Sequence, residues 1–276
     1  MISLEKYSGL PIAMRDDYSL EFADQVSSAP PLTAEFPSIK NYLKNPLSTY
    51  WRRDVYHIYR DVAVAKHKDK ILQAGLSYNL TVIPPGLIGD EFVKTRGHYH
   101  TAKEAAAIRY PEIYEVIYGK AFFVLQSASD DLERLKEIYL LEALRGEKVV
   151  VPPGFGHVCV NPADDVLVVA NWKSLKCGEI HEPYEAKNGA AYYVTESEIL
   201  GVKGKTVKES EFVPNLSYSF LPKLKVAALR QLPKYDLVSA IPMYFSAIRN
   251  MDTLDFLKNP ENYLEEITSE KLFKLV

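Results

Sequence analysis

The chain has only two cysteines among its 276 residues, too few for a disulfide framework. Thirty-three basic and 36 acidic side chains give a formal net charge of −3, so no overall field attracts nucleic acid or an anionic membrane. The longest nearly uncharged apolar stretch, 237–248, contains Pro242 and falls short of the roughly 18 residues that a membrane span needs. The first residues lack a basic segment followed by an apolar one. We therefore expect a cytoplasmic protein that binds neither nucleic acid nor membranes.

Internal repeats, low-complexity tracts and blocks of like charge are also absent. The apolar content of 47% is ordinary for a globular protein, and the length allows one large domain or two small ones. Turn residues and periodicity divide the chain into three zones. We predict an N-terminal arm over 1–70, a β-barrel domain over 71–186 and a C-terminal extension over 187–276.

The middle zone is a succession of short apolar, β-branched and aromatic runs. They are LSYNLTVI, FVKTRGHYH, EIYEVIYG, AFFVLQS, KEIYLLEAL, EKVVVPP and DVLVVANW, separated by turn sequences such as PPG, SASDD, PPGFG and NPADD. Many short strands at this spacing predict a mainly β sandwich or barrel.

The two ends of the chain differ from the middle zone in their residue patterns. In the arm, the alternating run YWRRDVYHIYRDVAVA predicts a strand. Beyond about residue 187, the run AAYYVTESEILGVK could still belong to the β-domain. The rest has helical spacing, and four prolines divide it into short pieces at positions 222, 233, 242 and 260. We expect a largely helical extension that packs on the barrel or on a second subunit.

Three of the six histidines fall in two compact motifs of the middle zone. In Gly97-His98-Tyr99-His100, the alternation of a strand turns both imidazoles to one face, at a separation that suits one metal ion. Such a pair by itself is more often a barrel lining in which neighbouring groups satisfy both rings.

The second motif places a third histidine opposite this pair. The turn Pro152-Pro153-Gly154 predicts that His157 enters on a strand antiparallel to KVVV. Glu112 opens the run EIYEVIYG, which Gly119 is expected to close into a hairpin with AFFVLQ. A carboxylate on that strand completes a set of three nitrogens and one oxygen.

The pattern G-H-x-H, then E-x6-G, then G-x5-P-x-G-x2-H-x3-N resembles the two motifs of the cupin superfamily. The flanking sequences TVIPPGLIGDEFVKTRGHYH, PEIYEVIYGKAFFVLQ and VVPPGFGHVCVN are similar to those of the archaeal cupin-type glucose-6-phosphate isomerases. The resemblance covers about residues 78–172. It implies a double-stranded β-helix (jelly roll), a homodimer, one divalent metal ion, and an enzyme of glycolysis and gluconeogenesis that interconverts glucose 6-phosphate and fructose 6-phosphate.

The resemblance also implies roles for particular residues. The metal ligands are His98, His100, Glu112 and His157; the catalytic residues are Glu112 and Tyr114; the substrate contacts are Thr81, Thr95, Gly97, His181 and Tyr184. The threonines and Gly97 would hold the phosphate, while Tyr114, on the same face as Glu112 by period two, would line the sugar pocket. Iron, manganese, nickel and zinc all suit three imidazoles and a carboxylate.

Several points stay open at this stage. The loop before Glu112 is long, so Glu104 or Glu115 is an alternative ligand, although E-x6-G favours Glu112. Trp172 stands where the family usually has a pocket tyrosine. Lys94 and Arg96 alternate with Thr95, which predicts that they face away from the pocket into solvent.

A cupin fold does not determine one activity. A non-catalytic sugar-phosphate-binding protein and a non-haem metal oxygenase are the alternatives to an isomerase. The hydrogen transfer between C1 and C2 could use an enediol intermediate or a hydride shift, and acceptance of mannose 6-phosphate is open. His57 and His67, outside the motifs, are expected to be structural or exposed, and Cys159, in an apolar run, is expected to be unreactive.

Overall fold

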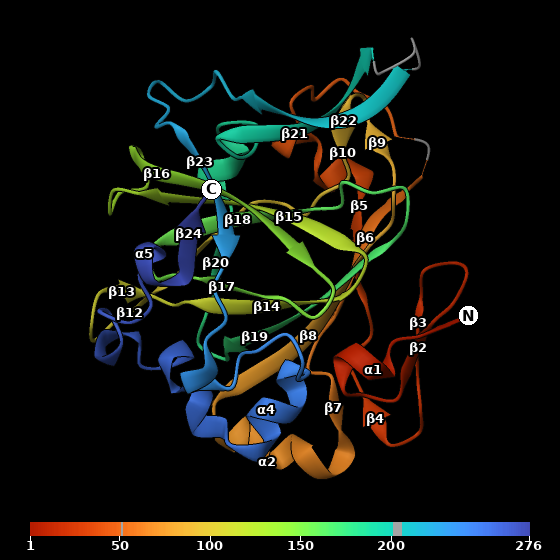
Figure 1. Ribbon diagram of the computed structural model, residues 1–276, viewed down its shortest axis with the longest axis vertical. Coiled ribbons are helices and arrows are strands. Elements are labelled where there is room, and N and C mark those ends of the chain that lie inside the picture. The colour runs from red at the N-terminus through yellow and green to blue at the C-terminus, as the bar shows by residue number, and fades with distance from the viewer. Residues whose placement is uncertain (51, 201–205) are drawn as a thin grey trace.

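The computed structural model describes residues 1–50, 52–200 and 206–276, and its centre is a pair of facing β-sheets (Figure 1). The first sheet has six strands in the order β17-β14-β19-β8-β6-β5. These strands are β17 (Lys148–Val151), β14 (Glu112–Tyr118), β19 (Leu167–Ser174), β8 (Leu76–Ile83), β6 (Asp54–Tyr59) and β5 (Leu32–Glu35). The second has five strands in the order β18-β15-β16-β23-β24. They are β18 (Phe155–Val160), β15 (Lys120–Ala128), β16 (Leu135–Leu144), β23 (Leu224–Leu229) and β24 (Phe273–Leu275).

The barrel strands are buried on both faces. Every residue of β8, β17 and β18 is buried, which explains why their sequences are nearly continuous apolar runs rather than alternating ones. Contacts such as Tyr114 of β14 against Phe123 of β15, with ring centroids 5.2 Å apart, join the inner faces of the two sheets. The prediction of a mainly β jelly roll is confirmed.

The predicted hairpin of β14 with β15 is wrong. β14 and β15 belong to different sheets, and so do β17 and β18. Gly119, between β14 and β15, has φ = 83°, and a Cβ atom there would lie 2.6 Å from the carbonyl oxygen of Val166. The turn residues were identified correctly, but each turn carries the chain from one sheet to the other. His157 of β18 lies directly beside His98, with which it forms an antiparallel β-bridge.

The N-terminal arm is partly built into the barrel. β6 pairs with β8, and β5 pairs with β6, so the first sheet continues across the predicted boundary at residue 70. The open edge of β8 has backbone groups that need partners, and the arm supplies them. The other elements of the arm are β1 (Ile2–Ser3), α1 (Glu5–Ser8), β2 (Ile12–Met14), β3 (Leu20–Phe22), β4 (Val26–Ser27), η1 (Phe36–Ser38), η2 (Lys40–Tyr42), β7 (Ala63–Val64), η3 (Ala65–His67) and α2 (Lys68–Gln73).

The prediction of a largely helical C-terminal extension is wrong for β23, whereas the run that could still belong to the β-domain does form a strand. β21 (Tyr192–Leu200) and β22 (Thr206–Pro214) form a long antiparallel pair, and β23 adds to β16 in parallel. The helical spacing of LKVAAL was overridden because the edge of β16 needs backbone partners. Short helices follow: η5 (Pro233–Tyr235), α4 (Met243–Arg249), η6 (Met251–Leu257), η7 (Pro260–Asn262) and α5 (Ser269–Leu272). Prolines stand at the start of three of them, as predicted.

Short strand pairs connect these parts. They are β9 (Leu87–Ile88) with β10 (Glu91–Phe92), which extends the β21–β22 pair; β11 (Tyr99–His100) with β20 (Glu179–Ile180); and β12 (Ala102–Lys103) with β13 (Ile108–Arg109). α3 (Glu182–Glu185) follows β20. The loop before Glu112 that made its ligand assignment ambiguous is thus a small hairpin, β12–β13, and it accommodates the extra residues outside the barrel.

A buried ion pair attaches the extension to the first sheet. Glu115 of β14 lies 2.8 Å from Lys148 of β17, and its other oxygen accepts a hydrogen bond from the backbone N–H of Met243. The Lys148 ammonium also donates to three carbonyl oxygens, those of Gly146, Val238 and Ile241. Burial raises the pKa of Glu115 to about 7, although Lys148 opposes this shift.

Candidate metal centre

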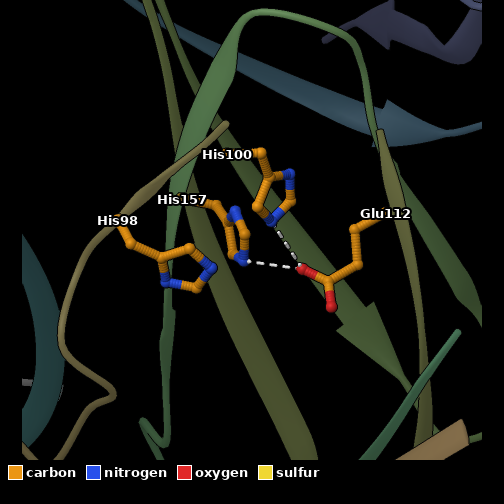
Figure 2. Close-up of side chains that lie close together, drawn as sticks. All are labelled: His98, His100, Glu112 and His157. Atoms are coloured by element: carbon orange, nitrogen blue, oxygen red, sulfur yellow. Dashed lines mark hydrogen bonds and ion pairs between the residues drawn. The ribbon is translucent and has the colours of Figure 1, made fainter. Parts of the chain in front are cut away.

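Four side chains converge between the two sheets (Figure 2). His98 and His100 come from the β11 segment, Glu112 from the first residue of β14, and His157 from β18 of the opposite sheet. One potential ligand atom from each lies within 4.8 Å of the others. The predicted set of His98, His100, Glu112 and His157 is therefore a real cluster, and it can hold a metal ion.

The spacing within the cluster fits a metal ion. Glu112 Oε2 lies 3.1 Å from His100 Nε2 and 3.3 Å from His157 Nε2. Two ligands bonded to one ion at about 2.0–2.1 Å, at tetrahedral or octahedral angles, are about 2.8–3.4 Å apart. The Nδ1 atom of His100 donates to the carbonyl oxygen of Tyr110 over 2.8 Å, which leaves Nε2 free to bind a metal.

Electrostatics favours the metal-binding protonation state at Glu112 and His98. At His100, burial is outweighed by Cys177 and Glu112, which raise its pKa to about 10, so this imidazole must lose a proton when a metal binds. Burial alone would raise the pKa of Glu112, but hydrogen bonds from His100 and His157 hold it well below the usual range, so the carboxylate is ionised. Burial, followed by the neighbouring His157 and His100, lowers the pKa of His98 well below its ordinary value. An ionised carboxylate and a neutral imidazole are the forms that coordinate a cation.

Two further side chains fix the carboxylate of Glu112. The Tyr114 hydroxyl donates to Glu112 Oε2 over 3.0 Å and lies 2.8 Å from His157 Nε2, as its predicted position on the Glu112 face requires. Asn171 of β19 donates from Nδ2 to the other oxygen, Oε1. Sequence reasoning missed Asn171. Alternation along β19 places Asn171 on the inner face, opposite its register partner Tyr114. That alternation is the feature of the sequence that could have identified Asn171.

A cavity of about 320 Å³ opens beside the cluster. Six of the predicted site residues line it: Thr81, Thr95, His98, Glu112, Tyr114 and His181. A more open groove of about 790 Å³ between β22 and the β15–β16 pair has no histidine or cysteine among its described lining residues. The cavity is thus the hollow that the cluster faces.

Gly97 and Tyr184 lie behind the cavity wall. A Cβ atom on Gly97 would lie 1.9 Å from the ring of Tyr184, whose side chain is fully buried. Neither residue belongs to the described lining of the cavity. Tyr184 therefore supports the backbone that carries His98, and the glycine allows the ring to pack directly against that backbone.

The threonines and Cys159 occupy different positions in the cavity wall. The Thr95 hydroxyl accepts a hydrogen bond from the backbone N–H of Cys159 over 3.0 Å, which ties its loop to β18. Thr81 of β8 is almost fully buried. Burial raises the pKa of the Cys159 thiol, in agreement with the expectation that this cysteine is unreactive.

Charged side chains that the sequence reasoning missed or misplaced surround the cavity. Arg60, Arg96, Lys173 and Glu179 all line it. The prediction that Lys94 and Arg96 face solvent is wrong. Lys94 is buried in an ion pair with Glu91, and Arg96 is only partly exposed, because the loop between β10 and β11 is not a regular strand and does not alternate.

Trp172 has no part in the cavity. It is fully buried on the other side of β19, between Tyr78 and Tyr244, with ring centroids 4.8 and 6.0 Å away. The neighbouring residues Asn171 and Lys173 are the ones that face the cavity. Trp172 therefore does not take the place of a tyrosine hydroxyl in this cavity.

The alternative ligands and the other histidines lie elsewhere. Glu104 is exposed, and Glu115 is held by Lys148, so Glu112 is the carboxylate of the cluster. His57 lies 3.0 Å from the Thr33 hydroxyl, and His67 lies 3.1 Å from the Tyr244 hydroxyl. Both are structural or partly exposed, as expected.

Fold and site together define a double-sheet β-barrel that carries a histidine–glutamate cluster suited to one metal ion. The family model described as "Glucose-6-phosphate isomerase (GPI)" matches residues 39–209, more than half of the chain, and the chain belongs to this family. No helix among the described residues is long and apolar enough to cross a membrane.

Individual relatives agree with the family assignment. The chain is 31% identical over 114 residues to the glucose-6-phosphate isomerase of Pyrococcus abyssi, a match that covers 41% of this chain and 51% of that one. It is 25% identical over 161 residues to the enzyme of Pyrococcus horikoshii, covering 57% and 76%. The chain spans about half the length of most of the curated relatives it matches.

Solved structures of cupin enzymes are also similar to this chain, at lower sequence identity. An oxalate oxidase gives a TM-score of 0.34 at 18% identity, covering 46% of this chain and 54% of that one. An oxalate decarboxylase from Bacillus subtilis gives 0.32 at 20% identity, covering 46% and 27%.

Proposed function

We propose that the protein is a metal-dependent aldose–ketose isomerase that interconverts glucose 6-phosphate and fructose 6-phosphate. The observation that carries the proposal is the cluster of His98, His100, Glu112 and His157, one side of which faces a cavity large enough for a small polar ligand. Membership of the glucose-6-phosphate isomerase family supports the choice of substrate.

The ion would be held by the three imidazoles and Glu112. When bound, a divalent cation such as iron, manganese, nickel or zinc supplies a Lewis acid that stabilises negative charge on adjacent substrate oxygens. Asn171 and Tyr114 keep the Glu112 carboxylate oriented towards the imidazoles from its two oxygens. This second layer of hydrogen bonds makes the site rigid before any ligand enters.

We propose Glu112 as the group that carries the hydrogen between C1 and C2 as a proton. It lines the cavity, and its carboxylate lies 3.0 Å from the Tyr114 hydroxyl, which can take up and return a hydrogen bond as the charge of Glu112 changes. Incorporation of solvent deuterium into product supports this route, whereas transfer without any exchange supports a hydride shift.

The phosphate would lie near Thr81 and Thr95, and the backbone N–H of Gly97 would add a donor from behind the cavity wall. Arg96 lines the same region, and its buried Nε atom has no hydrogen-bond partner among the described residues. A guanidinium with a free donor is well suited to a phosphate monoester. His181 would contact the sugar. Tyr184, buried behind Gly97, would act only by supporting that backbone.

Subunit and domain organisation remain predictions. We propose a homodimer whose catalytic unit is the barrel of residues 71–186, completed by β5 and β6 of the arm. Sedimentation velocity at micromolar concentration tests the dimer: a single species near 31 kDa would contradict it.

The activity is tested with fructose 6-phosphate in a coupled assay for glucose 6-phosphate. We expect turnover that a chelator abolishes and that added manganese, iron, nickel or zinc restores. The absence of metal-dependent turnover would refute the isomerase. Oxygen consumption with a small organic substrate would instead indicate an oxygenase, and sugar-phosphate binding without turnover would indicate a non-catalytic binding protein.

A further inference from the structure

A second polar cluster borders the cavity next to the proposed metal ligands. Glu179 of β20 is its centre: Oε1 lies 2.7 Å from Lys173 Nζ and 3.8 Å from Arg60, and Oε2 lies 3.3 Å from His181 Nε2. We refer to Arg60, Lys173, Glu179 and His181 as the Glu179 cluster. The hydrogen bond with His181 contributes most to holding the pKa of Glu179 far below its usual value, and Lys173 adds to it, so the carboxylate is ionised.

The backbone places the Glu179 cluster beside the metal ligands. Glu179 is the register partner of His100 in the β11–β20 pair. The His181 ring lies 5.3 Å from the His98 ring, centroid to centroid. The cluster therefore borders the part of the cavity where C1 and C2 of a sugar phosphate would react.

The Lys173 ammonium has N–H donors that no described residue accepts. Its side chain is only 15% exposed and lies on the cavity face of β19, two residues after Asn171. An ammonium group has three N–H donors, and one is directed at Glu179. The described residues provide no second hydrogen-bond acceptor for it.

A buried ion pair is weak support for stability, because desolvation offsets its attraction. A carboxylate that holds a lysine at a cavity wall has a more specific effect: it fixes the direction of the ammonium before a ligand arrives. Fixed positive charge beside the reacting atoms is the arrangement that stabilises an oxyanion as it forms.

We propose that Lys173, oriented by Glu179, donates a hydrogen bond to the substrate oxygen on C1 or C2 and stabilises the negative charge that develops there. Lys173 is thus a catalytic residue and Glu179 a positioning residue. The inference rests on the proposed isomerase function and adds a contact at the reacting end of the substrate.

Lys173 assists the conversion of the aldose to the ketose. A base removes the proton on C2, the electrons of that C–H bond form C1=C2, and the carbonyl electrons move to O1. The resulting enediolate takes the proton back at C1, the hydroxyl proton of O2 moves to O1, and C2=O forms. Negative charge passes between O1 and O2, and the ammonium stays protonated throughout.

The test compares Lys173→Met, Lys173→Arg and Glu179→Gln with Lys176→Met, which removes an exposed lysine three residues away. Each variant is assayed with fructose 6-phosphate. Calorimetry then measures the binding of two probes to each metal-loaded protein: an aldonic acid phosphate, whose carboxylate mimics the charged reacting end, and inorganic phosphate. Metal content per chain is determined in parallel.

We expect kcat to fall roughly 10²-fold in Lys173→Met with a smaller change in KM, by analogy with the loss of one oxyanion donor. Lys173→Arg should recover part of the loss, and Glu179→Gln should reduce kcat less than Lys173→Met. In Lys173→Met the aldonic acid phosphate should bind about tenfold more weakly or worse, with inorganic phosphate binding and metal content unchanged. Lys176→Met should behave as wild type.

A kcat for Lys173→Met within about threefold of wild type would overturn the inference, and so would an equal loss of affinity for both probes or a loss of metal. A wild-type protein without isomerase activity would refute the proposed function instead. The comparison of the two probes would still decide whether Lys173 recognises a charged reacting end.

Discussion

The buried pair of Glu115 and Lys148 predicts how stability depends on pH. Burial raises the pKa of Glu115 to about 7 in the folded protein, from 4.5 in the unfolded chain. The folded state therefore binds more protons than the unfolded state between these values. The free energy of unfolding must then fall as pH rises from 4.5 to 7, and the loss is complete above 7.

The magnitude follows from the two pKa values. One pKa unit corresponds to about 1.4 kcal/mol, so Glu115 alone should lower the free energy of unfolding by about 2.5 kcal/mol between pH 5 and pH 8. Glu115→Gln removes this titration and keeps one oxygen, which can accept from either Met243 N–H or Lys148. The variant should lack this part of the pH dependence.

Urea unfolding at several pH values between 5 and 8, in the presence of a chelator, measures the effect. Other groups titrate in both proteins, so the difference between wild type and Glu115→Gln isolates Glu115. Glu104→Gln, at an exposed position, is the control and should match wild type at each pH. Parallel stability curves for wild type and Glu115→Gln would refute the reasoning.

Three further predictions concern the cluster and its surroundings. Removal of metal should lower the free energy of unfolding, by about 2.7 kcal/mol relative to protein with free metal at 100 times its Kd, and a melting temperature unchanged by chelator would count against a metal site. Gly97→Ala would bring a Cβ atom 1.9 Å from the buried Tyr184 ring, so it should cost about 1–3 kcal/mol in chemical unfolding and reduce bound metal; wild-type values for both would contradict the packing described. Trp172→Phe should destabilise the protein by roughly 1–2 kcal/mol but leave KM for sugar phosphate within about twofold, because the indole faces away from the cavity; a large rise in KM would place Trp172 in the substrate site.

The sequence best predicted those features of the structure that depend on a single strand. The run LSYNLTVI predicted β8 over its full length, and the alternation of His98 with His100 and of Glu112 with Tyr114 predicted which side chains share a face. These predictions depend only on the twofold period of a strand, which is a local property of the chain.

Pairing between strands was less predictable. Gly119 and the Pro152–Gly154 turn were identified, yet the strands on either side of each turn enter different sheets, and the hairpin predicted at Gly119 does not form. A turn residue determines the local backbone, whereas the partner of each strand depends on which edges remain open in the folded barrel. The same reason explains why β23, with helical spacing in its sequence, adds to β16.

The charged lining of the cavity was the least predictable part. Arg96 lies in an irregular loop, where alternation gives no guidance, and Glu179 reaches the cavity only through the short β11–β20 pair. Asn171 and Lys173 follow from the alternation of β19 once its inner face is known, but the motifs of the family did not include them.

The central claim is that His98, His100, Glu112 and His157 hold the metal ion on which sugar-phosphate isomerisation depends. The most direct measurement is the coupled assay with fructose 6-phosphate on metal-loaded wild type, His157→Ala and His57→Ala, the last of which removes a histidine outside the cluster. We expect wild type and His57→Ala to turn over substrate and His157→Ala to lose both activity and bound metal. Unchanged activity in His157→Ala would contradict the site described.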